Sequence, residues 1–312
     1  MIDKILVTGS NGMLGNSLIP MLKKTNKIIL TPSSKKLNLL DSLSIENYLK
    51  KNKPDQIIHL AGYIGGIGAS INEPVNFLQN NLLMGINLVR SSYQFKIKNF
   101  INIGSSCIYP PNLKKPIKEN QLLEGKIEKT NEGYALAKIS TIKLCEYISL
   151  NKKYNYLSLI PCNIYGPNDK FDEVNGHLVG SLVKKIFKAK LNKKKYVEIG
   201  GTGKPKRELI YVDDVSQSII KFMKKKNLTN KKVYWINIGS GEENKVIEIA
   251  KKIAKIVKYN CKFKFNLKKP DGVKTKLMNI SLSKKLGWKP KIRLDEGLIK
   301  TVNWFKDNND LV

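Results

Sequence analysis

The chain has 312 residues, and its 56 lysines and arginines against 25 acidic residues give a formal net charge of +31. This length allows one or two domains with a sizeable core and excludes a small scaffold that depends on disulfides or a metal. No apolar run approaches the roughly 18 residues of a membrane span, and the N-terminus lacks the pattern of an export signal. We expect a cytoplasmic protein without a membrane partner.

The excess of positive charge raises the question of nucleic acid binding, because a cationic surface attracts phosphates. Only three of the basic residues are arginine, the side chain that makes the commonest base-specific contacts. The lysines occur in runs no longer than three, as at 193–195 and 224–226, and not in long blocks. We therefore predict solvated lysine faces and no nucleic acid partner.

The cysteines and histidines are scattered and have no CxxC or other metal-ligand spacing. They are Cys107, Cys145, Cys162, Cys261, His59 and His177. This pattern predicts free thiols and no metal site. His59 lies inside an apolar run and is predicted to be structural.

Short apolar runs alternate with segments of helical periodicity over the first half of the chain. The predicted strands are residues 4–8, 28–31, 56–61, 100–104 and 156–161. The predicted helices are residues 13–24, 44–51, 75–95 and 135–150. This alternation is typical of βαβ units, so we predict an α/β fold with a doubly wound parallel sheet of the Rossmann type.

The pattern changes after about residue 167. The segments predicted there are a helix at 177–188, a glycine-rich strand and turn at 197–203, a strand at 208–212, a helix from 213, and a strand at 233–238 that returns to the main sheet. We expect residues 1–167, with segments near 208–240, to form the dinucleotide-binding domain. Residues 168–207 and 241–312 are expected to form a smaller, interleaved α/β domain that binds the substrate.

A glycine-rich turn follows the first predicted strand and opens a helix. Its candidate cofactor residues are Gly9, Asn11, Gly12, Met13, Leu14 and Gly15. Such glycines allow a pyrophosphate to approach the helix N-terminus, whereas the alternative is a tight turn without a ligand. The second predicted strand leads to Ser33, Ser34 and Lys35, and no acidic residue follows to hold a ribose 2′-hydroxyl. Hydroxyls and an ammonium group suit a 2′-phosphate, so we predict NADP(H) rather than NAD.

Tyr134 and Lys138 stand four residues apart in a predicted helix, so their side chains share one face. The lysine is expected to lower the pKa of the phenol, which then exchanges a proton near neutral pH. Ser105, at the end of the strand at 100–104, is placed to hydrogen-bond the same carbonyl oxygen. This set predicts hydride transfer to a ketone, for which the adjacent thiol of Cys107 is not needed.

Motifs over nearly the whole chain resemble the GDP-L-fucose synthase family, a branch of the extended short-chain dehydrogenases/reductases that acts on nucleotide sugars. The matching segments are GSNGMLG (9–15), LNLLD (37–41), GGI (65–67), GSSCIYP (104–110), NEGYALAK (131–138), NIYGPNDKF (163–171), GH (176–177), KPKRELIYVDD (204–214), KPDG (269–272) and LGW (286–288). GSSCIYP and KPDG are more specific to that family than the glycine motif.

The resemblance implies an enzyme that epimerises C3 and C5 of GDP-4-keto-6-deoxy-D-mannose and then reduces C4 with NADPH, giving GDP-L-fucose. In it, Ser105, Tyr134 and Lys138 match the reductase triad, and Cys107 and His177 match the epimerase acid/base pair. The chemistry also calls for such a pair, because a C4 ketone acidifies the hydrogens on C3 and C5. Inversion then needs a base and an acid that titrate near neutral pH.

The same resemblance implies further site residues and a partner. Lys185, Arg207 and Asp271 match positions that bind the GDP-sugar. A homodimer is implied through helices near 75–93 and 135–150. The further cofactor positions that it implies are Asn38, Leu39, Ala61, Lys138, Pro161, Asn163, Ile164 and His177.

Alternatives remain open at this stage. One is a reductase or an epimerase of another GDP-4-keto sugar, such as a deoxyheptose. A 4,6-dehydratase places Asp-Glu where this chain has Ser106-Cys107, and a UDP-sugar 4-epimerase needs neither Cys107 nor His177. A dinucleotide-sensing or RNA-binding module has no use for the full reductase triad. Individually, Cys107 also fits a core position, and His177 a helix cap.

Overall fold

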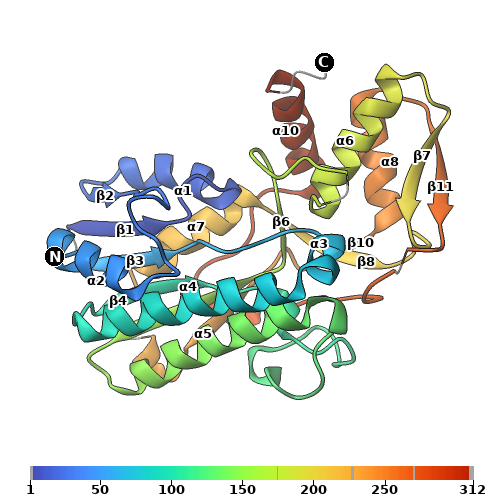
Figure 1. The fold of residues 1–312 in the computed structure, drawn as a ribbon. Coiled ribbons are helices and arrows are strands. Elements are labelled where there is room, and N and C mark those ends of the chain that lie inside the picture. The colour runs from blue at the N-terminus through green and yellow to red at the C-terminus, as the bar shows by residue number, and fades with distance from the viewer. Residues whose placement is uncertain (1–2, 174, 226–227, 270, 309–312) are drawn as a thin grey trace.

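The computed structural model describes residues 3–173, 175–225, 228–269 and 271–308. Its larger part is a six-stranded parallel sheet in the order β2-β1-β3-β4-β5-β9 (Figure 1). The strands are β1 (Lys4–Thr8), β2 (Ile28–Leu30), β3 (Gln56–His59), β4 (Asn99–Ile103), β5 (Asn155–Pro161) and β9 (Trp235–Ile238). The predicted doubly wound sheet is confirmed, and the strand predicted at 233–238 returns to it beside β5.

Helices cover both faces of this sheet (Figure 1). They are α1 (Met13–Lys23) and α7 (Val212–Met223) on one face, and α2 (Ser42–Asn52), α4 (Pro74–Gln94) and α5 (Glu132–Leu150) on the other. Side chains alternate across a strand, so Ile5 and Val7 of β1 pack with α1 and α7, while Leu6 packs with α2 and α4. Burial on both faces explains why these strands are continuous apolar runs in the sequence.

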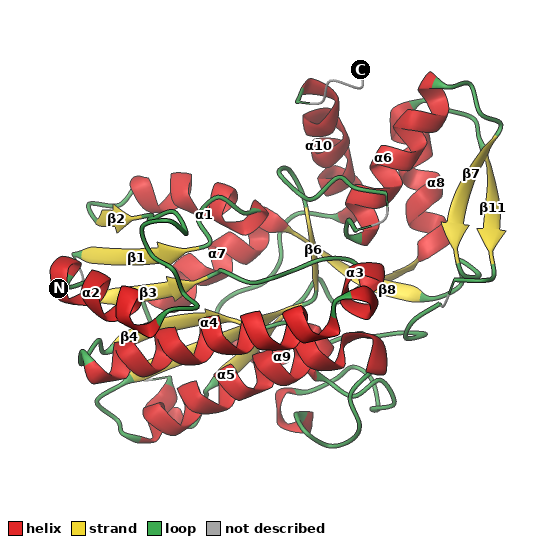
Figure 2. Ribbon diagram, in the orientation of Figure 1, coloured by secondary structure: helices red, strands yellow, loops and turns green. Residues whose placement is uncertain are grey.

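The smaller part of the molecule contains two further sheets (Figure 2). One has the order β10-β8-β6, and in the other β11 pairs with β7. These strands are β6 (Asn163–Tyr165), β7 (Tyr196–Gly200), β8 (Lys206–Tyr211), β10 (Glu243–Lys245) and β11 (Lys262–Asn266). The remaining helices are α3 (Ile67–Asn72), α6 (Leu178–Leu191), α8 (Val246–Val257), α9 (Ser281–Lys285) and α10 (Leu294–Asp307). The strand predicted at 208–212 is β8, which pairs outside the main sheet, whereas α7 directly after it packs on α1.

Among the described residues, no helix is both long and apolar enough to cross a membrane.

Glu208 of β8 is a fully buried carboxyl group that joins the three-stranded sheet to two loops. Its Oε1 accepts a hydrogen bond from the Gly241 N–H at 2.8 Å, and its Oε2 accepts one from the Met278 N–H at 2.9 Å. Burial raises the pKa of Glu208 to about 7, although these two bonds favour the ionised form. The folded chain therefore holds a proton that the unfolded chain releases near pH 4.5.

This difference predicts that the free energy of unfolding decreases as pH rises from 4.5 to about 7, because the native state binds more protons over that range. The decrease that Glu208 contributes is roughly 3 kcal/mol. Urea unfolding at a series of pH values measures it. Glu208→Gln is expected to flatten this dependence, while Glu242→Gln, at an exposed position nearby, leaves it unchanged. An equal pH dependence in Glu208→Gln would contradict the prediction.

Candidate active site

The glycine-rich loop between β1 and α1 has the geometry that a bound pyrophosphate requires. Gly9 has a φ of +70°, and a Cβ there would lie 2.6 Å from the Ala61 backbone nitrogen. A Cβ at Gly15 would lie 2.3 Å from the Ser10 carbonyl oxygen. At Gly12, in contrast, the nearest atom is the Gly9 carbonyl oxygen at 3.4 Å. Two glycines thus pack the loop tightly, and the third leaves the backbone open beside the N-terminus of α1, which fits a dinucleotide.

The other predicted cofactor residues follow the carboxyl ends of parallel strands. Ala61 follows β3, Pro161 ends β5, and Asn163 and Ile164 begin β6. Met13 and Leu14 open α1, while Asn38 and Leu39 stand between β2 and α2. Strands β1, β3, β4 and β5 are in parallel register, so these ends meet at one edge of the sheet. That edge is where open α/β sheets bind their ligands.

The end of β2 fits an NADP ribose phosphate. The Ser33 carbonyl accepts hydrogen bonds from the N–H groups of Lys36 and Leu37, which turns the chain there. Ser33, Ser34 and Lys35 are exposed on this turn, and no acidic residue stands between positions 28 and 40. The turn therefore offers hydroxyls and an ammonium group to a phosphate, with no carboxylate to repel it.

Ser105 and Cys107 lie directly after β4. Ser105 precedes the 3-10 turn η1 (Ser106–Ile108), and Cys107 lies within it. Ser105 caps this turn, because its hydroxyl oxygen accepts a hydrogen bond from the Cys107 N–H at 3.4 Å. Burial raises the pKa of the Cys107 thiol, and the ammonium groups of Lys276 and Lys138 oppose that effect. The expectation of a thiol that titrates near neutral pH is wrong in this structure, because desolvation outweighs the neighbouring charges.

Tyr134 and Lys138 occupy one face of α5, as the spacing predicts. Lys138 is buried, donates a hydrogen bond to the Ile103 carbonyl oxygen at 3.0 Å, and places its Nζ 5.6 Å from the centroid of the Tyr134 ring. Burial lowers the pKa of Lys138 to about 8. Burial also raises the pKa of Tyr134, and the charge of Cys107 adds to the rise. The predicted lowering of the phenol pKa by Lys138 is therefore wrong, because the spacing gives a shared face but not the desolvation.

His177 stands immediately before α6 as its N-cap, and its carbonyl oxygen accepts a hydrogen bond from the Ser181 N–H at 2.8 Å. Its Nδ1 lies 3.0 Å from Oδ1 of Asp169. Burial lowers the pKa of His177, but the hydrogen bond and the charge of Asp169 outweigh it, so the pKa is raised overall. Asp169 lies within the motif NIYGPNDKF but is not among the predicted site residues.

One loop connects the His177 side of the site with the Lys138 side. A Cβ at Gly62 would lie 3.8 Å from the Lys138 Nζ. Four residues on, the Gly66 N–H donates to the Asn175 carbonyl oxygen at 3.0 Å, two residues before His177. The loop after β3 therefore contacts both halves of the predicted catalytic set.

Of the three predicted substrate residues, the structure brings two together. Arg207 of β8 donates to the Val273 carbonyl oxygen at 2.7 Å and to the Asp271 carbonyl oxygen at 3.1 Å. The Asp271 carboxylate accepts hydrogen bonds from the Thr202 N–H at 2.6 Å and from its hydroxyl at 2.8 Å. Asp271 thus holds the turn after β7. Pro270 of the KPDG motif lies outside the described residues.

Lys185 lies on α6, facing the pair of strands β7 and β11. Burial lowers the pKa of Lys185, the ammonium of Lys269 lowers it further, and the carboxylate of Glu198 opposes both effects. Lys269 and Glu198 form an ion pair at 3.3 Å. The ammonium of Lys185 therefore lies within electrostatic reach of Lys269, in the segment that leads to Asp271.

Lys276 and Glu128 link the predicted catalytic residues to the predicted phosphate residues, and no motif or spacing in the sequence marks either of them. The Lys276 Nζ lies 4.0 Å from Oε2 of Glu128, and each side chain is 14% exposed. Lys276 acts on the thiol of Cys107, and Glu128 raises the pKa of the Arg207 guanidinium against the effect of burial. Lys276, Glu128 and Arg207 thus form a row of groups with alternating charge that begins beside the Cys107 thiol.

His59 is buried in β3, with its Nδ1 2.8 Å from the hydroxyl oxygen of Thr8 in β1. Burial and the charge of Lys138 lower the pKa of His59 to about 3. A neutral imidazole that joins two strands fits the structural role predicted for it.

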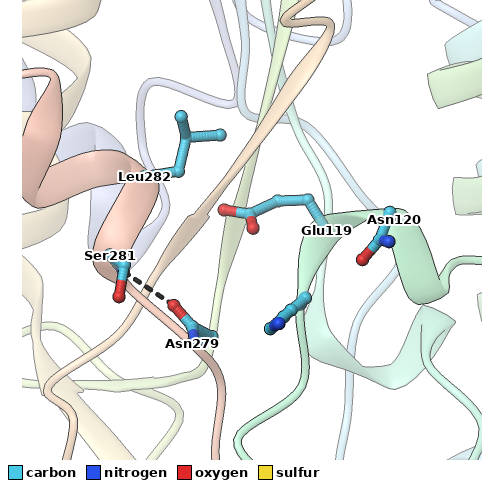
Figure 3. Close-up of a pocket in the computed structure, with 6 residues that line it drawn as sticks. Glu119, Asn120, Asn279, Ser281 and Leu282 are labelled. Atoms are coloured by element: carbon cyan, nitrogen blue, oxygen red, sulfur yellow. Dashed lines mark hydrogen bonds between the residues drawn. The ribbon is translucent and has the colours of Figure 1, made fainter.

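A hollow of about 510 Å³ lies away from these residues, between η2 (Glu119–Gln121) and α9 (Figure 3). Its lining residues are Lys118, Glu119, Asn120, Asn279, Ser281 and Leu282. None of them is a predicted site residue, so this hollow does not extend the candidate active site.

Comparison with known proteins decides the family. Residues 5–239, more than half of the chain, match the NAD dependent epimerase/dehydratase family. The chain belongs to this family. The matched range of this chain includes the glycine loop, the turn from Ser105 to Cys107, and the pair Tyr134 and Lys138.

Two relatives and one solved structure cover nearly the full length of this family member. A GDP-L-colitose synthase from Yersinia pseudotuberculosis is 43% identical, over 98% of this chain and 100% of the relative. A GDP-L-fucose synthase from Azorhizobium caulinodans is 36% identical, over 99% of this chain and 98% of the relative. The structure of a GDP-mannoheptose C4 reductase from Campylobacter jejuni with NADP bound has a TM-score of 0.87 at 28% identity, over 97% of this chain and 98% of the other.

Proposed function

We propose that this chain is an NADPH-dependent epimerase and reductase that converts GDP-4-keto-6-deoxy-D-mannose to GDP-L-fucose. The observation that carries the proposal is the position of Cys107 in the turn that Ser105 caps, directly after the strand whose Ile103 carbonyl holds Lys138. Full-length relatives named GDP-L-fucose synthase support the same substrate class.

The cofactor is NADP(H), held by the glycine loop, the exposed turn after β2 and the carboxyl ends of β3 and β5. When bound, NADPH supplies the hydride for C4. Ser105 and Tyr134 hydrogen-bond the C4 oxygen, on which negative charge grows, and Tyr134 gives it a proton. Lys138 donates a hydrogen bond to the Ile103 carbonyl oxygen, which holds its ammonium beside the Tyr134 ring.

Cys107 and His177 move protons at C3 and C5. The base takes the proton from carbon, and the electron pair of the broken C–H bond forms an enolate whose oxygen Ser105 and Tyr134 hold. The acid then returns a proton to the opposite face of the same carbon, which inverts it and restores the ketone. An imidazole exchanges protons near neutral pH. The ammonium groups of Lys276 and Lys138 favour the thiolate form of Cys107 and so oppose the rise in its pKa that burial causes.

The diphosphate of the GDP-sugar binds Arg207 and Lys185, because guanidinium and ammonium groups are the common phosphate ligands. Asp271 orders the turn beside them and stands next to the nucleotide sugar. In this division, residues 1–167 with the segments near 208–240 hold the dinucleotide. Residues 168–207 and 241–312 hold the substrate.

The enzyme is a cytoplasmic homodimer that pairs through α4 and α5. These two helices pack on each other and carry exposed apolar side chains on their outer surfaces. Those side chains are Val75, Leu78, Tyr93, Leu136, Tyr147 and Leu150. Exposed apolar side chains gathered on one pair of helices are typical of a protein interface.

A second candidate substrate comes from the relative with 43% identity, which is named GDP-L-colitose synthase. Colitose is the sugar that lacks the 3-hydroxyl of fucose. A GDP-4-keto-3,6-dideoxy sugar would use the same C4 reduction, with inversion at C5 alone. The Campylobacter jejuni neighbour is a GDP-mannoheptose C4 reductase, so C4 reduction without inversion is the third outcome that an experiment must separate.

One experiment separates these functions. The purified protein is mixed with NADPH and, in turn, with GDP-4-keto-6-deoxy-D-mannose, its 3-deoxy analogue and a GDP-4-keto heptose. Loss of the reduced nicotinamide absorbance reports reduction, and NMR of the product reports stereochemistry. GDP-L-fucose formed at the highest kcat/KM supports the proposal. If no GDP-4-keto sugar oxidises NADPH, the enzyme assignment fails.

A further inference from the structure

Asp169 and His177 form a partly buried pair. The proposed function assigns a role to His177 but none to Asp169. The side chain of Asp169 is 1% exposed and that of His177 is 33% exposed. Oδ1 of Asp169 lies 3.0 Å from the His177 Nδ1 and also accepts the Lys170 N–H at 2.7 Å. Oδ2 of Asp169 is buried and has no hydrogen-bond partner among the described residues.

The backbone around this pair is packed so that the carboxylate stays in place. A Cβ at Gly180, in the first turns of α6, would lie 3.0 Å from the Lys170 carbonyl oxygen and 3.2 Å from Oδ2 of Asp169. A Cβ at Gly176 would lie 2.4 Å from the Asp172 carbonyl oxygen. The two glycines therefore allow the loop after β6 to fold back onto the start of α6.

A buried carboxylate is unfavourable unless a hydrogen-bond donor or a positive charge compensates it. Here the Lys170 N–H and the imidazole both contact Oδ1, and of these two groups only the imidazole can carry a positive charge. An Asp that faces Nδ1 accepts the hydrogen of that nitrogen and fixes the tautomer of the ring. The other nitrogen, Nε2, then remains the one that exchanges protons.

We propose that Asp169 is the positioning residue of the epimerase step, holding His177 with a hydrogen on Nδ1 so that only Nε2 exchanges a proton with the substrate. This inference rests on the proposed function, in which His177 acts at C3 or C5. As an acid, His177 transfers the Nε2 proton to the enolate carbon. The nitrogen keeps the electron pair, the C–H bond forms, and the ketone is restored. As a base, it follows the reverse path.

The charged groups that act on His177 are few. Asp169 favours the imidazolium form, and the Lys170 ammonium disfavours it. Elsewhere in the loop, Glu173 is partly buried and pairs with Lys188 of α6 at 2.9 Å. Removing the charge of Asp169 should therefore lower the pKa of His177, whereas removing that of Glu173 should not.

The test uses the full chain, which contains only two histidines. Long-range ¹H–¹⁵N NMR of histidine-labelled protein reports the tautomer and the titration of both rings, and His59, with a pKa of about 3, is an internal reference that stays neutral. The native spectrum should show Nδ1–H for His177. Asp169→Asn should keep this tautomer and lower the pKa, because the amide oxygen still accepts the hydrogen. Asp169→Ala should give a mixture of tautomers.

Activity gives an independent measurement. Asp169→Ala should lower deuterium incorporation at C3 and C5 from heavy water by roughly 10- to 100-fold, as when an orienting partner is lost. In Asp169→Asn, the pH profile of deuterium incorporation should move to lower pH. Glu173→Gln should match the native enzyme in both the rate of incorporation and its pH profile. Should Asp169→Ala not fold, Asp169→Asn alone decides. A tautomer, titration and pH profile that are unchanged in Asp169→Asn and Asp169→Ala would overturn the proposal. If the native enzyme incorporates no deuterium, the proposed function fails, but the NMR result still decides the role of Asp169.

Discussion

Tyr134→Phe should lower ketone reduction by about 10²- to 10⁴-fold, the usual contribution of a positioned proton donor. Phenylalanine keeps the ring, whose centroid lies 6.4 Å from that of Phe77 and 5.6 Å from the Lys138 Nζ, so the packing is retained. Only the hydroxyl that gives a proton to the C4 oxygen is lost. Part of the exchange at C3 and C5 should survive, because Ser105 still holds the enolate oxygen.

Single-turnover NADPH oxidation measures the reduction, and NMR in heavy water measures the exchange. Tyr63→Phe is a matched control, because Tyr63 also packs edge-on against Phe77, with ring centroids 5.1 Å apart, but donates its hydroxyl hydrogen to Glu73. The control should reduce the ketone at the native rate. Native reduction in Tyr134→Phe would exclude Tyr134 from the role of proton donor.

The parts of the molecule that sequence could predict are those with a local pattern. The apolar runs of β1, β3, β4 and β5 predict buried parallel strands, because both faces of each strand are covered by helices. The spacing of Tyr134 and Lys138 predicts their shared face on α5, since helical geometry fixes it. Even the return of β9 to the main sheet follows from an apolar run after a helix.

The parts that sequence missed depend on contacts between distant segments. Lys276 and Glu128 meet near Cys107 only because the loop after β11 folds over the loop before α5. The direction of the pKa shift at Tyr134 depends on how deeply the ring is desolvated, which no spacing encodes. The strand β8 was predicted, but its pairing with β6 and β10 was not, because that pairing depends on how the chain folds after Pro161.

The second large effect is expected for Cys107→Ser, which should lower deuterium incorporation at C3 and C5 by about 10²- to 10⁴-fold. A serine hydroxyl has nearly the same shape, but it loses its proton far less readily than a thiol. Cofactor binding should be largely unchanged, because the glycine loop lies on β1 and α1 while Cys107 follows β4. NMR of the substrate in heavy water measures the exchange, and NADPH titration measures cofactor binding.

Cys261→Ser is the matched control, since Cys261 is also a partly buried free thiol but lies just before β11. It should exchange deuterium as the native enzyme does. Unaltered exchange in Cys107→Ser would show that another group moves the protons. Lys276 would then be the first residue to replace, because its ammonium is the charge that acts most strongly on the Cys107 thiol. Loss of exchange with retained cofactor binding would instead assign Cys107 to the epimerase step, separately from the reductase triad beside it.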